Sequence, residues 1–102
     1  MPTEKTAKVA SKPKAVSPIR VANNVFIRTV TMHYTGKIVG LTRDEILLSD
    51  AAWIADSGRF AQALANGSLN EVEPFPDGVI SIAAGGVIDV SDWRHALPRT
   101  VK

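Results

Sequence analysis

The chain has 102 residues, of which 45% are hydrophobic and 22% are charged, and its formal net charge at neutral pH is +2. This size and composition are typical of a single globular domain and exclude disorder throughout the chain. Cysteine is absent, which excludes disulfides and cysteine-bound zinc. No apolar run approaches the roughly 18 residues of a membrane span, so we expect a soluble, unsecreted protein without membrane contact.

Residues 1–24 are predicted to form a flexible basic arm. Residues 1–20 contain five basic residues and one acidic residue, a net charge of +4, whereas the other 82 residues contain seven basic and nine acidic residues, a net charge of −2. Three uses of the arm stay open: a solvated terminus, a non-specific contact with nucleic acid, and a strap docked on a neighbouring subunit. The arm residues expected to contact a partner are Lys5, Lys8, Lys12, Lys14, Ile19 and Arg20.

The domain is expected to span residues 25–102 and to begin with a long strand. Residues 25–34 are rich in β-branched and aromatic side chains and contain no Gly or Pro, which favours one uninterrupted strand. Alternation places Phe26 on one face and Val25 and Ile27 on the other. Both faces are partly apolar, so we expect this strand either to be covered on both sides or to bend as it enters a barrel.

Two further strands are expected after this one, each preceded by a turn. Residues 35–36 are predicted to form the first turn and residues 37–41 the returning strand. A second turn is predicted at residues 42–44, followed by the third strand at residues 45–54. A helix that begins before Trp53 is an open alternative to the end of this strand, because Ala and Trp tolerate either state.

One short helix is expected near residues 57–66. Asp56 or Ser57 can cap its N-terminus, and Gly67 is placed to end it in the left-handed conformation. Residues 68–78 are expected to form a loop, because they contain two prolines and an Asp-Gly turn.

Residues 79–90 predict a hairpin whose two β-rich arms meet at Gly85-Gly86, a dipeptide that accepts the positive φ values of a two-residue turn. The predicted fold class is therefore mainly β: a small five-stranded SH3-like/Sm-like barrel with one short helix and an extended N-terminal arm. The resemblance to Sm-like proteins rests on residues 36–39 and 46–51.

Residue types that carry chemistry are few and scattered. His33 and His95 do not form a pair with the spacing of metal ligands, and no serine lies in a nucleophile-elbow motif. Glu71, Glu73 and Asp77 are interpreted as a solvated loop rather than as an acid and base pair. We therefore predict no catalytic residue, no metal site and no cofactor, and we do not expect an enzyme.

The two tryptophans are the stronger indication of molecular recognition. Core packing is the simpler interpretation of Trp53 and Trp93. The alternative is that residues 92–95 form an interface patch, because tryptophan and arginine often anchor protein contacts. The predicted interface residues are Trp93, Arg94 and His95.

Four runs of residues resemble a group of small, functionally uncharacterised proteins of tailed phages and prophages; the runs are 26–39, 50–64, 70–78 and 92–99. The resemblance implies a phage gene product and carries over no functional residue. Together with the arm it suggests a structural accessory protein of the virion, such as a head decoration, vertex or connector component.

Such a protein is expected to bind the major capsid protein or other virion proteins through its barrel and arm, to form a homo-oligomer, and to occupy the host cytoplasm before assembly and the virion afterwards. The alternative is a small nucleic-acid-binding regulator of the Sm-like kind, with the arm lysines on the phosphates.

Overall fold

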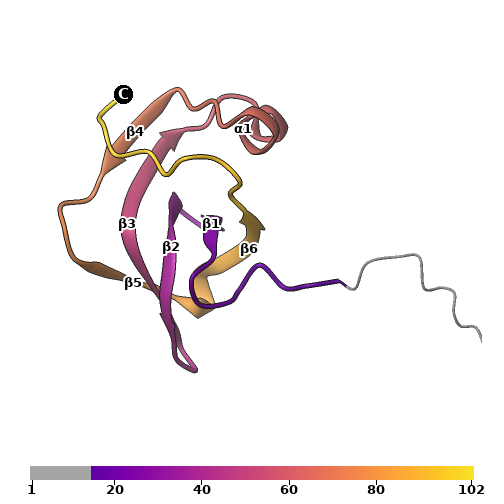
Figure 1. The fold of residues 1–102 in the computed structure, drawn as a ribbon, viewed down its shortest axis with the longest axis vertical. Helices are drawn as coiled ribbons and strands as arrows, with labels where there is room; N and C mark the ends of the chain where they lie inside the picture. The colour runs from indigo at the N-terminus through magenta and orange to yellow at the C-terminus, as the bar shows by residue number, and fades with distance from the viewer. Residues whose placement is uncertain (1–14) are drawn as a thin grey trace, which may run out of the picture.

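A computed structural model describes residues 15–102 of the chain (Figure 1). Its elements in chain order are β1 (Asn24–Thr29), β2 (His33–Leu41), β3 (Glu45–Asp56), α1 (Phe60–Asn66), β4 (Glu71–Pro74), β5 (Val79–Ala83), the 3₁₀ turn η1 (Ala84–Gly86) and β6 (Val87–Asp92). The strands form one antiparallel sheet in the order β4-β3-β2-β1-β6, with β5 also paired to β3. The prediction of a mainly β protein with one short helix is confirmed.

The strand β1 is buried on both faces, which is one of the two arrangements that its sequence predicted. Val25, Phe26 and Ile27 are all fully buried. Val25 and Ile27 belong to the first core, which consists of Val25, Ile27, Ile38, Ile46, Leu48, Ala51 and Ile82. Phe26 belongs to the second core, which consists of Phe26, Ala52, Ile54, Ala63, Leu69, Val72 and Trp93. One strand thus separates two apolar clusters.

The longest strand, β3, bends at Asp50 and serves both cores. Its N-terminal half pairs with β5 and its C-terminal half with β4. Asp50 has φ 50°, and the register between β2 and β3 shifts opposite it. A one-residue bulge moves the alternate side chains that follow it to the opposite face of the sheet. Leu48 therefore faces the first core, whereas Ile54 faces the second. Trp53 lies on this strand, so the helical alternative is wrong.

The predicted long strand over residues 25–34 is interrupted by a turn at residues 30–32. The Thr29 hydroxyl donates to the Met32 carbonyl at 2.6 Å and accepts from the Met32 amide at 2.9 Å. Threonine can close turns in this way, in competition with the strand ladder. Residues 35–36, predicted to form a turn, consequently lie inside β2.

The predicted loop over residues 68–78 contains the strand β4. Its inner edge pairs with β3, and its outer edge is covered by the end of the chain. The Val72 amide donates to the Lys102 carbonyl at 3.1 Å, and the Lys102 amide donates back to Val72 at 3.0 Å. The two prolines are compatible with this strand because Pro74 is its last residue and Pro76 lies beyond it.

The predicted hairpin over residues 79–90 is wrong. Its two arms form separate edges of the sheet, because β5 pairs with β3 and β6 pairs with β1, and η1 joins them. Within residues 15–102 no pair of strands links β5 to β6, so this six-stranded sheet is not closed into the predicted five-stranded barrel.

The short helix α1 ends where the sequence predicted. Gly67 has φ 75°, and its amide donates to the Ala63 carbonyl at 2.8 Å. The predicted N-terminal cap is wrong, because Arg59 occupies that position and makes no capping bond. The Asp56 carboxylate instead accepts from the Gly58 amide at 2.8 Å and shapes the preceding turn. No helix in the described part of the chain has the length and hydrophobicity needed to cross a membrane.

We expect Gly67→Ala to lower the free energy of unfolding by about 1–3 kcal/mol, because the new Cβ adds left-handed backbone strain and a steric clash. That Cβ would lie 2.7 Å from Cγ of His95. Gly85→Ala is the control, since nothing lies within 4 Å of its added Cβ. Urea unfolding measures both variants, and equal stability of the two would contradict the prediction.

Thr35→Val is expected to raise the free energy of unfolding by about 1 kcal/mol, because a buried hydroxyl without a partner costs free energy. Thr35 is fully buried, and its Oγ1 has no hydrogen-bond partner among residues 15–102. Thr29→Val should destabilise the protein, since the Thr29 hydroxyl closes the first turn. Thermal unfolding of both variants distinguishes the two effects, and a loss of stability in Thr35→Val would contradict this account.

Candidate functional site: an aromatic groove

An apolar groove lies at one border of the sheet, where β2, β3 and β4 run side by side. It has a volume of about 500 Å³. We call it the aromatic groove, and it is lined by Met32, Tyr34, Trp53, Glu73, Pro74, Phe75 and Pro76.

Side chains from three neighbouring strands form a row along this groove. Tyr34 of β2 is the register partner of Trp53 of β3, and Trp53 is in turn the partner of Glu73 of β4. Directly paired residues share a face of the sheet, so the three side chains form a row. Trp53 lies on the face of β3 opposite the buried Ile54, and 36% of its surface is exposed.

The wall of the groove is held in place by several contacts. The Tyr34 and Phe75 rings stack with 6.2 Å between their centroids, and both pack against the first core. The Phe75 amide donates to the Ala51 carbonyl at 2.9 Å. Arg99 donates to the carbonyls of Ala51 and Phe75, each at 2.9 Å. Because these bonds tie the wall to β3, a ligand meets a groove that is already formed.

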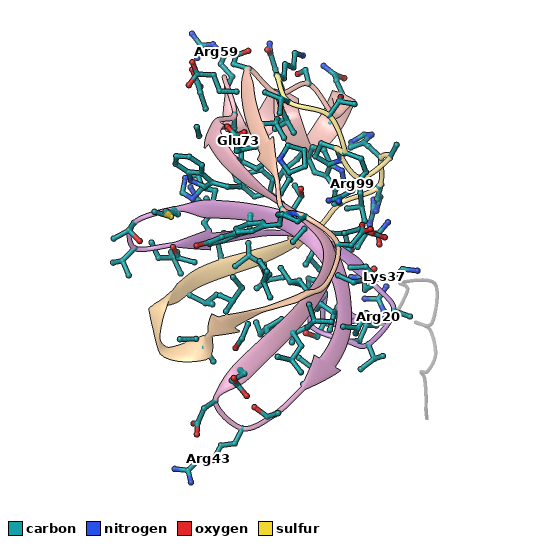
Figure 2. All side chains as sticks on the ribbon, turned by 90° about the vertical axis from the view of Figure 1, so that its left-hand side faces the viewer. Arg20, Lys37, Arg43, Arg59, Glu73 and Arg99 are labelled. Atoms are coloured by element: carbon teal, nitrogen blue, oxygen red, sulfur yellow. The ribbon has the colours of Figure 1, made fainter. Side chains whose placement is uncertain are left out.

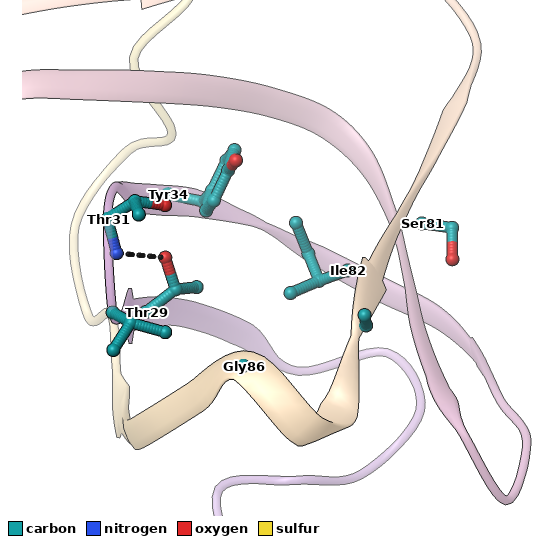
Figure 3. A pocket seen from close by; sticks show the side chains of 8 residues that line it. Thr29, Thr31, Tyr34, Ser81, Ile82 and Gly86 are labelled. Carbon is teal, nitrogen blue, oxygen red and sulfur yellow. Dashed lines mark hydrogen bonds between the residues drawn. The ribbon is translucent and has the colours of Figure 1, made fainter.

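A second hollow of about 190 Å³ opens between the first turn and the end of β5 (Figure 3). Figure 3 shows Thr29, Thr31 and Tyr34 on one side of it and Ile82 pointing in from β5, whereas the Ser81 side chain points away. The Thr29 hydroxyl is already engaged by the backbone of the turn, including the Thr31 amide at 3.4 Å. This smaller hollow offers a ligand less apolar surface than the aromatic groove.

A charged row crosses β6, β1 and β2 and fastens α1 to the sheet. Asp89, Arg28 and His33 are register neighbours. The Arg28 guanidinium binds the Asp89 carboxylate through two nitrogens and lies 4.3 Å from the centre of the Phe60 ring. The hydrogen bond from Arg28 lowers the pKa of Asp89, and the same bond raises the pKa of Arg28. These interactions give the row a structural role.

The predicted interface residues are not brought together on the surface. Trp93 is only 3% exposed and packs in the second core, where its Nε1 donates to the Ala96 carbonyl at 3.1 Å. The His95 Nε2 donates to the Leu64 carbonyl at 2.7 Å and so holds the end of α1. Arg94 is exposed and lies 3.4 Å from Asp92. Of the three residues, Arg94 alone presents most of its side chain to a partner.

The predicted arm residues are divided in the structure. Lys5, Lys8, Lys12 and Lys14 lie outside the described residues. Ile19 is 42% exposed. Arg20 lies against the domain, 3.7 Å from the Asp92 carboxylate. Asn23 also donates to Asp92, at 2.8 Å, and this bond lowers the pKa of that carboxyl group. Residues 18–23 are thus fastened to the domain.

Trp53, the central residue of the groove, was not among the residues predicted to bind a partner. The sequence did contain a signal, because alternation along residues 45–54 places Trp53 opposite the inward-facing Ile54. That signal does not distinguish a covered outer face from an exposed one, so core packing was the simpler interpretation.

Within residues 15–102, no three His, Asp or Glu side chains gather in a way that could hold a metal ion. Comparison of the chain with protein-family models, curated proteins and solved structures gave no match.

The Arg28–Asp89 pair predicts an acid-dependent loss of stability. The pKa of Asp89 is lower in the folded protein than its ordinary value of 3.8, so the stabilisation is present above that value and is lost as the pH falls through the folded pKa. We expect urea unfolding between pH 5 and pH 2 to show a smaller acid-induced loss for Asp89→Asn than for the unmodified chain. An exposed Asp77→Asn control should follow the unmodified chain. Identical pH profiles for all three proteins would contradict this prediction.

Proposed function

We propose that the protein is a non-catalytic structural accessory protein of a phage virion, which binds neighbouring virion proteins through the aromatic groove. The observation that carries this proposal is the row formed by the half-buried Tyr34 and the exposed Trp53 beside two prolines. Contiguous exposed apolar surface of this kind marks binding sites on soluble domains. Aromatic side chains are also the residues that most often dominate the energy of protein contacts.

The groove is better suited to binding than to chemistry. Glu73 is the one carboxylate that lines it, whereas most of its surface is aromatic, proline or methionine. Rigid rings and prolines lose little conformational entropy when a partner docks, so their buried area contributes efficiently to affinity.

The resemblance to phage proteins supports the proposal that this protein is part of a virion. A relation to the SH3-like or Sm-like barrels is likewise a proposal. A small, rigid, strongly bent sheet suits a component that is repeated over a particle surface. Repetition lets weak contacts add up, because linked sites bind with far higher avidity than single ones. Head decoration, vertex and connector positions all offer such repetition, with the free protein in the host cytoplasm before assembly.

A second candidate function, nucleic-acid binding, is favoured by the distribution of basic residues. Figure 2 shows Arg20, Lys37 and Arg99 on one side of the molecule. The arm lysines would extend this basic side along a phosphate backbone. Two of the three residues already have partners, however, since Arg20 lies beside Asp92 and Arg99 binds backbone carbonyls.

Mass spectrometry of purified phage particles tests the proposed function. We expect the unmodified chain at a fixed copy number relative to the major capsid protein. Trp53→Ala should lower this copy number about tenfold or more, because loss of a central tryptophan commonly costs 2 kcal/mol or more of binding energy. Ile88→Ala is the matched control, since Ile88 is 62% exposed and lies outside the groove.

Absence of the unmodified chain from particles would contradict the virion setting. Binding of DNA or RNA by the free protein, with an affinity that falls steeply as salt is added, would then favour the second candidate. Equal incorporation of Trp53→Ala and Ile88→Ala would show that the groove does not mediate assembly. Thermal unfolding of each variant establishes that it is folded before particles are analysed.

A further inference from the structure

We propose that the aromatic groove binds residues 2–14 of a second copy of this chain. The inference rests on the proposed function, because it names the neighbouring virion protein that occupies the groove. The N-terminal segment of each copy would then bind the groove of one neighbour, and its own groove would bind the segment of another.

Charge complementarity is the first argument. Glu73 lines the groove, and Glu71 lies two residues away on the same exposed side of β4. Residues 1–14 contain four lysines and one glutamate, a net charge of +3. A basic segment that crosses β4 would therefore pass an acidic rim, which favours encounter and orientation of the two surfaces.

The side chains of the segment suit the shape of the groove. Proline rings and extended backbone dock well on grooves lined by aromatic side chains, because an extended proline-containing segment loses little entropy on binding. Residues 2–14 offer Pro2 and Pro13 with the apolar Val9 between them. Trp53 and Tyr34 supply the flat apolar surface that such side chains require.

The direction in which the first described residues run favours binding to the groove of a second copy over binding to the groove of the same molecule. Figure 1 shows the first described residues running outward beside β1 and β6, away from β3 and β4, which carry the groove. Fourteen extended residues span at most about 50 Å. The described residues extend 54 Å along their longest axis. To reach its own groove, the segment would have to reverse direction and pass around the domain, whereas a neighbouring copy requires no reversal.

Complementation between two defective full-length variants tests the inference. The first variant carries Lys→Glu at positions 5, 8, 12 and 14 and keeps an intact groove. The second carries Trp53→Ala and keeps an intact segment. Sedimentation velocity at matched concentrations should show that the unmodified chain associates, that each variant alone is monomeric, and that an equimolar mixture of the two forms a one-to-one dimer.

Two controls make the result specific. Ile88→Ala should associate like the unmodified chain, because the substitution lies outside the groove. Adding Glu71→Lys and Glu73→Lys to the first variant should restore its self-association, because the charge complementarity is then reversed on both sides. We expect Trp53→Ala to weaken association about tenfold or more, and we expect added salt to weaken it further.

Several outcomes would overturn the inference. A monomeric unmodified chain at its highest soluble concentration would do so, as would association that persists in both variants. A monomer in which the Lys→Glu substitutions change the fluorescence of Trp53 would show that the segment docks on its own molecule. The composition of particles is measured independently of self-association. If the chain does not self-associate but is incorporated into particles normally, only this inference is overturned. If the chain self-associates but is absent from particles, only the virion setting is overturned.

Discussion

The structure depends on the bend of β3 at Asp50. One strand of 12 residues pairs with β2 along its length and with β5 and β4 in succession. The bend is possible because Gly36 lies opposite it, where an added Cβ would come within 3.1 Å of Leu48. Because the bulge moves alternate side chains of β3 to the opposite face of the sheet, the same strand contributes Leu48 to the first core and Ile54 to the second.

The groove follows from this geometry rather than from a dedicated loop. Tyr34 and Phe75 pack against the first core and also line the groove. The bonds from Arg99 connect the groove wall to the backbone at the bend. A contact at the groove is therefore supported by packed strands, which is the arrangement that holds a binding surface rigid.

The separation of charge along the chain is the basis of the proposed exchange of segments. A domain with an acidic rim beside its groove carries a basic N-terminal segment. A contact in which the N-terminal segment of one copy binds the groove of another is heterologous, because the two surfaces differ. Repeated heterologous contacts build rings or open arrays. The proposed exchange of segments would thus account for repetition of one small chain over a larger shell.

The sequence alone determined the mainly β class, the two apolar faces of β1, and the end of α1 at Gly67, because propensity, alternation and the left-handed preference of glycine act locally. Only the tertiary structure decided that Trp93 is buried while Trp53 is exposed. It also decided that residues 79–90 form two separate edges and that residues 71–74 form a strand. These outcomes depend on which distant strand pairs with which, because strand pairing decides which surfaces are covered.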